Sequence, residues 1–266
     1  MQQLKISILG AGNVATHLAI SLYLKGHSIV QIFSRNILNA QTLAIKVKAL
    51  AINELSNLYN DVDLILLCVS DSAISEIIKQ IEFQPKLIAH TAGSVSINEL
   101  NKFANYGVFY PLQTFTKNSE LNIKTVPFCI EANTQENKNT LLNLASDLSD
   151  SVYEMNTEQR IQCHLAAVFA NNFANHMFHV SEQLLNKNQI PFDILKPLIL
   201  ETANKVQYTS PSLLQTGPAS RNDQMVIEKH LTLLNSPHLK KIYSFVSNSI
   251  WELKNKQHLN KNTNDE

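Results

Sequence analysis

Short apolar runs alternate with amphipathic stretches over the first half of the 266-residue chain. The segment Leu64-Ile65-Leu66-Leu67-Cys68-Val69 is apolar throughout, as in a strand that is buried on both faces of a sheet. Alternating strands and helices indicate a parallel sheet with crossover helices. We predict strands over residues 4–9, 28–33, 63–69 and 86–90 and helices over 14–25, 36–47 and 72–80. Further strands at 108–110, 128–131 and 151–155, around a helix at 134–148, extend this sheet.

The pattern changes after residue 156, where strand-like runs stop and only helical periodicity follows. Helices are expected over residues 157–188, 192–208, 223–234 and 236–256. The predicted organisation is an α/β domain over 1–156, an all-α second domain over 157–256, and a polar, frayed tail over 257–266.

A glycine-containing turn joins the first strand to the first helix, with the sequence Gly10-Ala11-Gly12-Asn13-Val14-Ala15. The first glycine permits a tight turn, the second lets the backbone approach a pyrophosphate, and Ala15 allows close packing of helix on strand. Phosphates then bind the free N–H groups at the helix N-terminus. Because the chain has only six glycines, this arrangement favours a Rossmann dinucleotide site. The alternative is a tight turn without a ligand.

The end of the second strand bears on the choice of cofactor. NAD sites usually carry an acidic residue there, which binds the ribose 2′-hydroxyl. This chain has Ser34-Arg35-Asn36 instead, and a guanidinium can pair with a 2′-phosphate. We therefore expect NADP(H) in preference to NAD(H). In the alternative interpretation, Arg35 is simply a solvated residue at the start of a helix.

Ligands in such sheets lie beyond the carboxyl ends of the strands, which adds later residues to the predicted cofactor site. Val69 and Ser70 follow one buried strand, and His90 and Gly93 follow the next. His90 is placed to approach the nicotinamide, although a structural, hydrogen-bonded histidine is the competing interpretation.

The helix that begins near residue 157 has an unusual composition. Residues 164–181 include no Asp, Glu, Lys or Arg. At 3.6 residues per turn Asn171 and Asn175 align with His164, and Arg160 lies near the same line. An uncharged polar stripe suggests burial against a cleft or another domain. The alternative is that asparagines occupy a solvent-exposed face. We expect no metal site, because His176 and His179 lack a third ligand.

A loop in the second domain, Thr216-Gly217-Pro218-Ala219-Ser220-Arg221-Asn222-Asp223, adds one more candidate residue. Arg221 could hold a substrate carboxylate through two hydrogen bonds. An Arg221–Asp223 bridge that only organises the loop is the competing interpretation.

Four motifs together resemble a family of bacterial two-domain proteins assigned as NADP oxidoreductases, whose helical second domain has no assigned function. They are the glycine turn, Tyr110-Pro111-Leu112-Gln113-Thr114-Phe115, His164-Leu165-Ala166-Ala167-Val168-Phe169-Ala170-Asn171-Asn172-Phe173, and the 216–223 loop. More distantly, the chain is similar to the 6-phosphogluconate dehydrogenase-like superfamily. That similarity implies a cofactor between the domains and a homodimer formed through the helical domain.

The resemblance also exposes a departure. β-Hydroxyacid dehydrogenases of that superfamily carry a catalytic lysine, with an asparagine one turn later, on the first helix of the second domain. In this chain the helix has no lysine before Lys187, and His164 occupies the comparable region with Asn171. The resemblance therefore places proton transfer on His164 and substrate orientation on Asn171 or Asn172.

Composition adds exclusions. Basic and acidic residues number 22 each, so no net field attracts nucleic acid or an anionic membrane. There is no apolar run of about 20 residues, no signal peptide, and only three dispersed cysteines, which favours a cytoplasmic protein. The leading hypothesis is an NADP(H)-dependent oxidoreductase of a small carbonyl, hydroxy-acid or imine substrate at the interdomain cleft. A non-catalytic dinucleotide-binding sensor or scaffold is the alternative, and a deazaflavin-linked NADP reductase is a third possibility.

Overall fold

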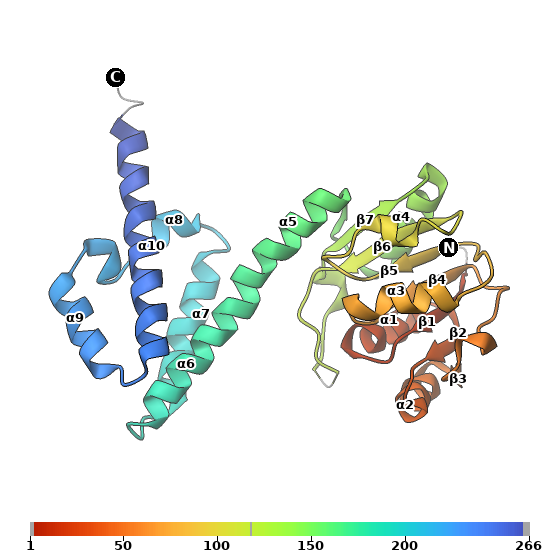
Figure 1. Ribbon diagram of the computed structural model, residues 1–266, viewed down its shortest axis with the longest axis horizontal. Helices are drawn as coiled ribbons and strands as arrows, with labels where there is room; N and C mark the ends of the chain where they lie inside the picture. The colour runs from red at the N-terminus through yellow and green to blue at the C-terminus, as the bar shows by residue number, and fades with distance from the viewer. Residues whose placement is uncertain (1–2, 118, 263–266) are drawn as a thin grey trace. The chain divides into compact units, whose positions relative to one another are not determined.

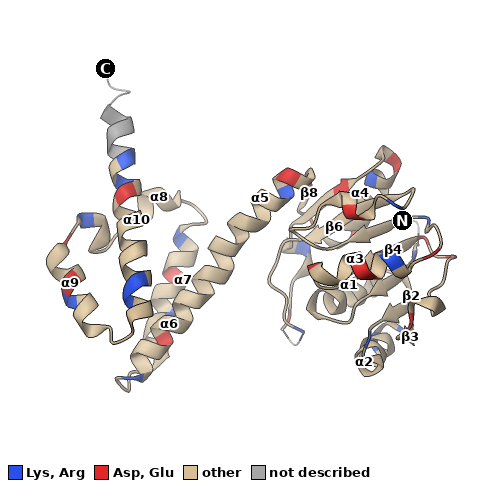
Figure 2. Cartoon of the chain, in the orientation of Figure 1, with Lys and Arg blue, Asp and Glu red and all other residues tan. Residues whose placement is uncertain are grey.

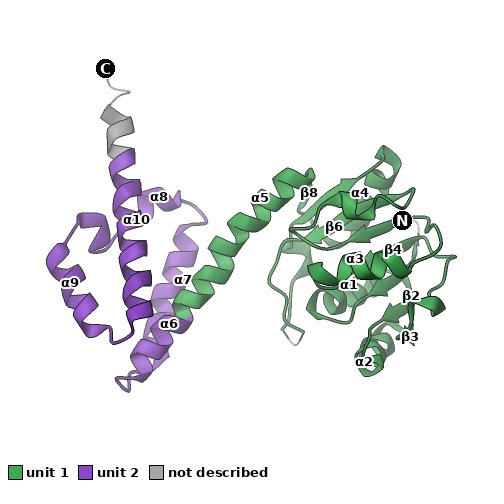
Figure 3. Cartoon of the chain, in the orientation of Figure 1, with its two compact units in different colours: residues 1–178 green, residues 179–266 purple. Residues whose placement is uncertain are grey.

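The computed structural model describes residues 3–117 and 119–262, which form two compact units, residues 1–178 and 179–266 (Figure 3). Unit 1 contains an eight-stranded sheet in the order β3-β2-β1-β4-β5-β6-β7-β8. All neighbours are parallel except β6 and β7. The strands are β1 (Lys5–Leu9), β2 (Ser28–Phe33), β3 (Leu50–Ile52), β4 (Leu64–Leu67), β5 (Ile88–His90), β6 (Tyr106–Pro111), β7 (Phe128–Ala132) and β8 (Val152–Glu154). The order of the first six strands is that of a Rossmann fold, as predicted.

Helices cover both faces of this sheet (Figure 1). The helices α1 (Asn13–Leu24), α2 (Ile37–Val47) and α4 (Gln135–Leu148) pack on one face, against alternate residues of β1 such as Ile6 and Ile8. The helix α3 (Asp71–Gln80) and the short turn η2 (Ile97–Leu100) pack on the other face. Remaining single-turn helices of this unit are η1 (Leu55–Asn57) and η3 (Ile123–Thr125). The strand β4 is buried between the two helix layers, and alternate residues of it pack against each layer. It lies within the continuous apolar run that was recognised in the sequence.

A long helical segment follows β8 and starts at the residue predicted. It comprises α5 (Thr157–Ala167), the π-helical segment η4 (Val168–Phe173) and α6 (Ala174–Asn186). Asn156 caps α5 in a capping box with Gln159. A π segment was not expected, and its wider turn rotates the residues beyond it relative to a uniform α-helix. The assumption of 3.6 residues per turn, on which the alignment of Asn175 with His164 depends, is therefore wrong.

Unit 2 is helical, as predicted, apart from its connections. Its elements beyond α6 are η5 (Phe192–Leu195), α7 (Lys196–Lys205), α8 (Pro211–Leu214), η6 (Ala219–Arg221), α9 (Gln224–Leu233) and α10 (Pro237–Asn262). Asp223 caps α9 and Pro237 opens α10. The helix α10 continues past the predicted end at residue 256, so the first part of the predicted frayed tail is helical. Residues 263–266 of that tail lie outside the described residues.

The division between the units falls at Phe178 and His179, within α6. Residue 156, the boundary proposed from the sequence, marks the point where strands give way to helices. Every helix in the described residues is too short or too polar to span a lipid bilayer.

Candidate functional site

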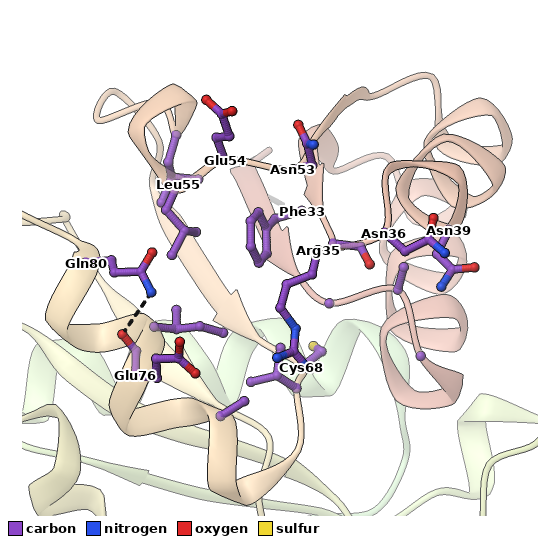
Figure 4. Close-up of a pocket in the computed structure, with 18 of the residues that line it drawn as sticks. Phe33, Arg35, Asn36, Asn39, Asn53, Glu54, Leu55, Cys68, Glu76 and Gln80 are labelled. Carbon is purple, nitrogen blue, oxygen red and sulfur yellow. Dashed lines mark hydrogen bonds between the residues drawn. The ribbon is translucent and has the colours of Figure 1, made fainter.

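A cavity of about 1080 Å³ lies where three neighbouring strands of unit 1 end (Figure 4). Its lining includes the residues that follow β1, β2 and β4, namely the 10–12, 34–36 and 68–70 segments. The strand order reverses between β1 and β4, and this is the position at which Rossmann folds bind their ligand. The helix α3 and the segment after β3 complete the walls.

Two glycines shape the floor of the cavity in different ways. Gly10 has φ +128°, and a Cβ atom there would lie 2.1 Å from the carbonyl oxygen of Cys68. A Cβ atom at Gly12 would meet no atom within 4 Å. Gly10 is thus required by the close approach of β1 and β4, whereas Gly12 leaves open space in front of α1.

The N-terminus of α1 faces this space without a competing side chain. Its N-cap residue, Gly12, provides no side-chain hydrogen bond, and the first turn has no acidic residue. Asn13 donates its side-chain amide to the Phe115 carbonyl at 2.8 Å, and Ala15 is fully buried. The first backbone N–H groups of the helix, including that of Val14, and the helix dipole therefore suit an anion such as a pyrophosphate.

The end of β2 supplies the side chains proposed to select the cofactor. Ser34, Arg35 and Asn36 all line the cavity, and Figure 4 shows the Arg35 side chain extending across it. Asn36 also caps α2, because its Oδ1 accepts the backbone N–H of Leu38 at 3.0 Å. Glu54, which follows β3, lines the same cavity and was not singled out in the sequence. The lining thus contains a guanidinium together with three carboxylates, those of Glu54, Glu76 and Glu82.

The other predicted cofactor residues divide into two pairs. Val69 and Ser70 line the cavity, whereas His90 and Gly93 are not part of its lining. His90 has no exposed surface, and its Nδ1 accepts the N–H of Ala92 at 3.2 Å. Burial, with a contribution from the charge of Arg160, lowers the pKa of His90 to about 4. His90 is therefore neutral at physiological pH.

A second group of polar side chains gathers at the carboxyl ends of β5 and β6. The Tyr110 hydroxyl lies 2.9 Å from Nδ1 of His164, and the two rings meet edge to face with centroids 5.9 Å apart. Gly93 packs beneath this pair, since a Cβ there would lie 2.5 Å from the same His164 nitrogen. Gly93 is therefore required by packing, with His164 and Tyr110 covering it.

The cation beneath this pair is Arg160, one turn before His164 on α5. It has no exposed surface. Its Nη1 donates to the carbonyls of Ala92 and Gly93, at 3.1 and 2.9 Å, and its Nη2 pairs with Glu131 at 3.2 Å. Because both terminal nitrogens are occupied and the side chain has no exposed surface, Arg160 ties the loop after β5 to the start of α5 and is not free to bind a ligand.

The surroundings of Tyr110 keep its hydroxyl protonated. Burial, with smaller effects of Cys129 and Cys163, raises the pKa of Tyr110 to about 12. Cys129 is paired with Tyr110 across β6 and β7, and burial raises the pKa of its thiol to about 11. Tyr110 is therefore a neutral hydroxyl over the whole neutral range, able to donate a hydrogen bond to His164 or to accept one from it.

The remaining predicted catalytic residues are not brought into this group by described contacts. Asn171 and Asn172 lie in η4, are exposed, and make no side-chain hydrogen bond with the described residues. Arg221 is exposed on η6 in unit 2 and forms no ion pair there among the described residues. The 216–223 loop is instead organised by Ser220, which is buried and accepts a hydrogen bond from Lys254 at 2.9 Å. The predicted roles of Asn171, Asn172 and Arg221 stay predictions.

Comparison with known proteins connects both parts of the chain to one family. Residues 5–93 match the family model described as NADP oxidoreductase coenzyme F420-dependent, and residues 126–250 match a domain of unknown function (DUF2520). A crystal structure from Bacteroides fragilis, named as an NADP oxidoreductase, is 43% identical with a TM-score of 0.89. The match covers 94% of this chain and 98% of that one. The chain belongs to this family of NADP oxidoreductases.

More distant structures share the fold of the NADP oxidoreductase. A 1-pyrroline-5-carboxylate reductase from Streptococcus pyogenes is 18% identical, with a TM-score of 0.62 over 95% of this chain and 99% of that one. A reductive aminase from Aspergillus terreus, in complex with NADPH and ethyl-5-oxohexanoate, is 12% identical, with a TM-score of 0.72 over 96% and 99%. Curated proteins yield no significant match.

Several residues of the candidate site were not predicted from the sequence. Tyr110 stands in a motif that carried the resemblance, yet nothing in its own segment pairs it with His164, 54 residues away. Arg160 was noticed only as lying near the polar stripe, and Glu131 was not noticed at all. The one available signal for Arg160 was its spacing of one turn from His164.

Proposed function

We propose that the protein is an NADP(H)-dependent oxidoreductase of a small carbonyl, hydroxy-acid or imine compound, in which His164 transfers the proton. The observation that carries this proposal is the hydrogen bond between Tyr110 and His164, in the same unit as the dinucleotide cavity. A bound reduced nicotinamide supplies the hydride. Imidazole titrates near neutral pH and can supply or accept the accompanying proton.

Tyr110 has a positioning role in this proposal. Its hydroxyl oxygen accepts from Nδ1–H of His164 in both the imidazolium and the neutral Nδ1–H tautomer, so that Nε2 is the nitrogen that gives up or takes the proton. The hydrogen bond also fixes the orientation of the imidazole ring. Arg160 holds the Ala92–Gly93 backbone in place through two hydrogen bonds. Gly93 contacts the rings of both His164 and Tyr110, so this backbone supports both side chains.

On the cofactor side, backbone N–H groups at the start of α1 bind the pyrophosphate, and Arg35 binds the 2′-phosphate of NADP(H). The open space at Gly12, the uncapped helix and the exposed guanidinium support this assignment. The preference is tested by titrating NADPH and NADH into wild type and Arg35→Ala, following nicotinamide fluorescence. We expect the substitution to weaken NADPH binding at least tenfold and NADH binding only slightly. Equal losses for both dinucleotides would contradict the proposed selectivity.

The catalytic assignment is tested with His164→Ala, and His176→Ala, an exposed histidine of α6, serves as the matched control. NADPH oxidation is measured with a panel of carbonyl and imine compounds. We expect His164→Ala to keep its affinity for NADPH and to lose about 10²–10⁴-fold in turnover, while His176→Ala is unchanged. Unchanged turnover in His164→Ala would remove this residue from the mechanism. Tight NADPH binding by wild type, with no turnover of any compound, would favour the non-catalytic sensor or scaffold.

We also propose that the functional form is a homodimer in which a second copy covers exposed apolar side chains of the helical segments. Phe169 of η4, in unit 1, is 63% exposed, and Phe245 of α10, in unit 2, is 78% exposed. Figure 2 shows that the helical stretch through η4 carries no charged side chains, as expected for a surface that becomes buried. Sedimentation velocity over a range of concentrations tests this proposal, with Phe169→Ser expected to weaken the dimer. A monomer at high concentration would contradict it.

A further inference from the structure

One wall of the dinucleotide cavity is formed by successive turns of α3 and combines apolar with polar side chains. Ala73 and Ile77, four residues apart, present an apolar surface to the cavity. Glu76 and Gln80 line the same cavity from the same helix, also four residues apart. Figure 4 shows both polar side chains on this wall, across the cavity from the segment that carries Arg35 and Asn36.

The polar part of this wall offers hydrogen-bond acceptors. The side-chain amide nitrogen of Gln80 donates to the backbone carbonyl of Glu76 at 3.4 Å, which leaves the amide oxygen free to accept. The Glu76 carboxylate makes no ion pair or hydrogen bond with the described residues. Arg35, at the end of β2, is the basic side chain in the lining. A ligand group that is complementary to α3 therefore combines a hydrogen-bond donor with an apolar face.

The adenosine half of a dinucleotide contains one group of this kind. The base is flat and largely apolar, and its exocyclic amino group at position 6 donates two hydrogen bonds. We propose that Glu76 and Gln80 recognise this amino group while Ala73 and Ile77 contact the ring, so that the site selects adenine over 6-oxopurines. This inference rests on the proposed dinucleotide function. A 6-oxopurine such as hypoxanthine would place a carbonyl oxygen against the same acceptors, and its nearest remaining donor, the ring N1–H, lies at a different position, so at least one of the two acceptors loses its donor.

The first test compares two cofactors that differ only at position 6 of the base. NADPH and reduced nicotinamide hypoxanthine dinucleotide phosphate are titrated into the wild-type protein, and nicotinamide fluorescence reports binding without any need for turnover. We expect the hypoxanthine cofactor to bind about tenfold more weakly, because one good hydrogen bond is replaced by an unpaired carbonyl. Equal affinities would overturn the inference.

The second test assigns the selectivity to α3. Glu76→Gln introduces an amide that can donate to the 6-oxo group, so the ratio of the two dissociation constants should fall from about ten to near one. Glu54→Gln is the matched control, because Glu54 lines the same cavity from the segment after β3 and should leave the ratio unchanged. A ratio that stays at the wild-type value in Glu76→Gln would overturn the assignment, as would an equal fall in both variants.

A further variant separates recognition of the base from general damage to the cavity. Gln80→Met has a similar shape but no strong acceptor, so it should weaken NADPH binding about threefold and leave the hypoxanthine cofactor unaffected. Equal weakening of both cofactors would count against a role for Gln80 in base recognition. Cofactor binding without turnover in wild type would contradict the catalytic proposal and leave this inference intact, so the two failures are distinguishable.

Discussion

The two candidate functional regions of unit 1 lie at the same edge of one sheet but differ in composition. The dinucleotide region at β1 and β4 consists mainly of backbone, with Gly10 allowing a close approach and Gly12 leaving space for a ligand. The Tyr110–His164 region at β5 and β6 consists of packed side chains, and its glycine, Gly93, is covered by both rings. The absence of a side chain therefore has different consequences in the two regions. At Gly12 it leaves space for a ligand, and at Gly93 it allows two rings to pack against the backbone.

This difference determines what a substitution in each region should change. In the first region the proposed ligand contacts are the backbone N–H groups of α1, so a side chain that blocks them should affect binding more than folding. In the second region the support is Arg160, a fully buried cation held by two carbonyls and the Glu131 carboxylate. Loss of this cation leaves two carbonyl oxygens without this donor and a carboxylate without its counter-ion. A substitution here is therefore expected to lower the free energy of unfolding more than it weakens ligand binding.

The largest effect is therefore expected for Arg160→Met, which keeps the length of the side chain but removes its charge. It leaves the carbonyls of Ala92 and Gly93 without this donor and takes the cation away from the Glu131 carboxylate, which keeps only its hydrogen bonds from Thr157, at a cost of about 3–5 kcal/mol of unfolding free energy. Chemical denaturation measures this loss. Arg35→Met is the matched control, since Arg35 is exposed and should change stability by no more than about 0.5 kcal/mol. A loss below 1 kcal/mol in Arg160→Met would show that Arg160 is not the support of this region.

The same contrast explains how much could be predicted from the sequence. The parallel sheet, the glycine turn and the position of Arg35 at the end of β2 follow from local patterns, because strand, turn and helix are contiguous in the chain. The short strand β3, only three residues long, was missed because it shows no clear alternation. The π segment η4 was also missed, since its sequence differs little from that of an α-helix.

The Tyr110–His164 region could not be assembled from local patterns. Arg160 reaches carbonyls 67 and 68 residues earlier in the chain, and its carboxylate partner lies 29 residues away. Such contacts depend on how β5, β6, β7 and α5 pack, which the periodicity of one segment does not reveal. His164 was identified through a resemblance, and its partner Tyr110 emerged only with the fold.

A second comparison, Gly10→Ala against Gly12→Ala, separates the two purposes of glycine within the first region. Gly10→Ala introduces a Cβ 2.1 Å from the Cys68 carbonyl oxygen at a residue with φ +128°, so we expect a loss of about 2–4 kcal/mol in stability. Gly12→Ala meets no neighbour and should cost less than about 1 kcal/mol, yet it should abolish tight dinucleotide binding. Denaturation and fluorescence titration are carried out on both variants. Similar stabilities for the two variants would contradict the distinction.

The third prediction concerns His90, which lies beneath the second region. Its pKa in the folded protein is lowered to about 4 from an ordinary value near 6.5, first by burial and then by Arg160. Between these values the unfolded chain binds a proton that the folded protein does not, so stability falls as the pH falls from about 6.5 to 4. The contribution of His90 to this loss should be about 2–3 kcal/mol.

The variant His90→Asn isolates that contribution, because its side-chain oxygen can replace Nδ1 as the acceptor of the Ala92 N–H. The difference in unfolding free energy between wild type and His90→Asn is measured at pH 7 and at pH 4.5. We expect wild type to lose more stability than the variant on acidification. Parallel losses would mean that His90 titrates normally in the folded protein.

The smallest effect in stability, and the most informative for function, is expected for Tyr110→Phe. The substitution removes one hydrogen bond to His164 and keeps the ring that covers Gly93, so the cost is about 0.5–1.5 kcal/mol. The same energy in the transition state corresponds to a fall of about three- to tenfold in kcat.

A residue that only packed would leave the pH dependence of kcat unchanged. If Tyr110 fixes the protonated nitrogen of His164, the kcat–pH profile must shift in Tyr110→Phe while NADPH affinity stays the same. A profile identical to that of wild type would assign Tyr110 to packing alone, and the second region would then differ from the first in its supporting cation but not in its control of a proton.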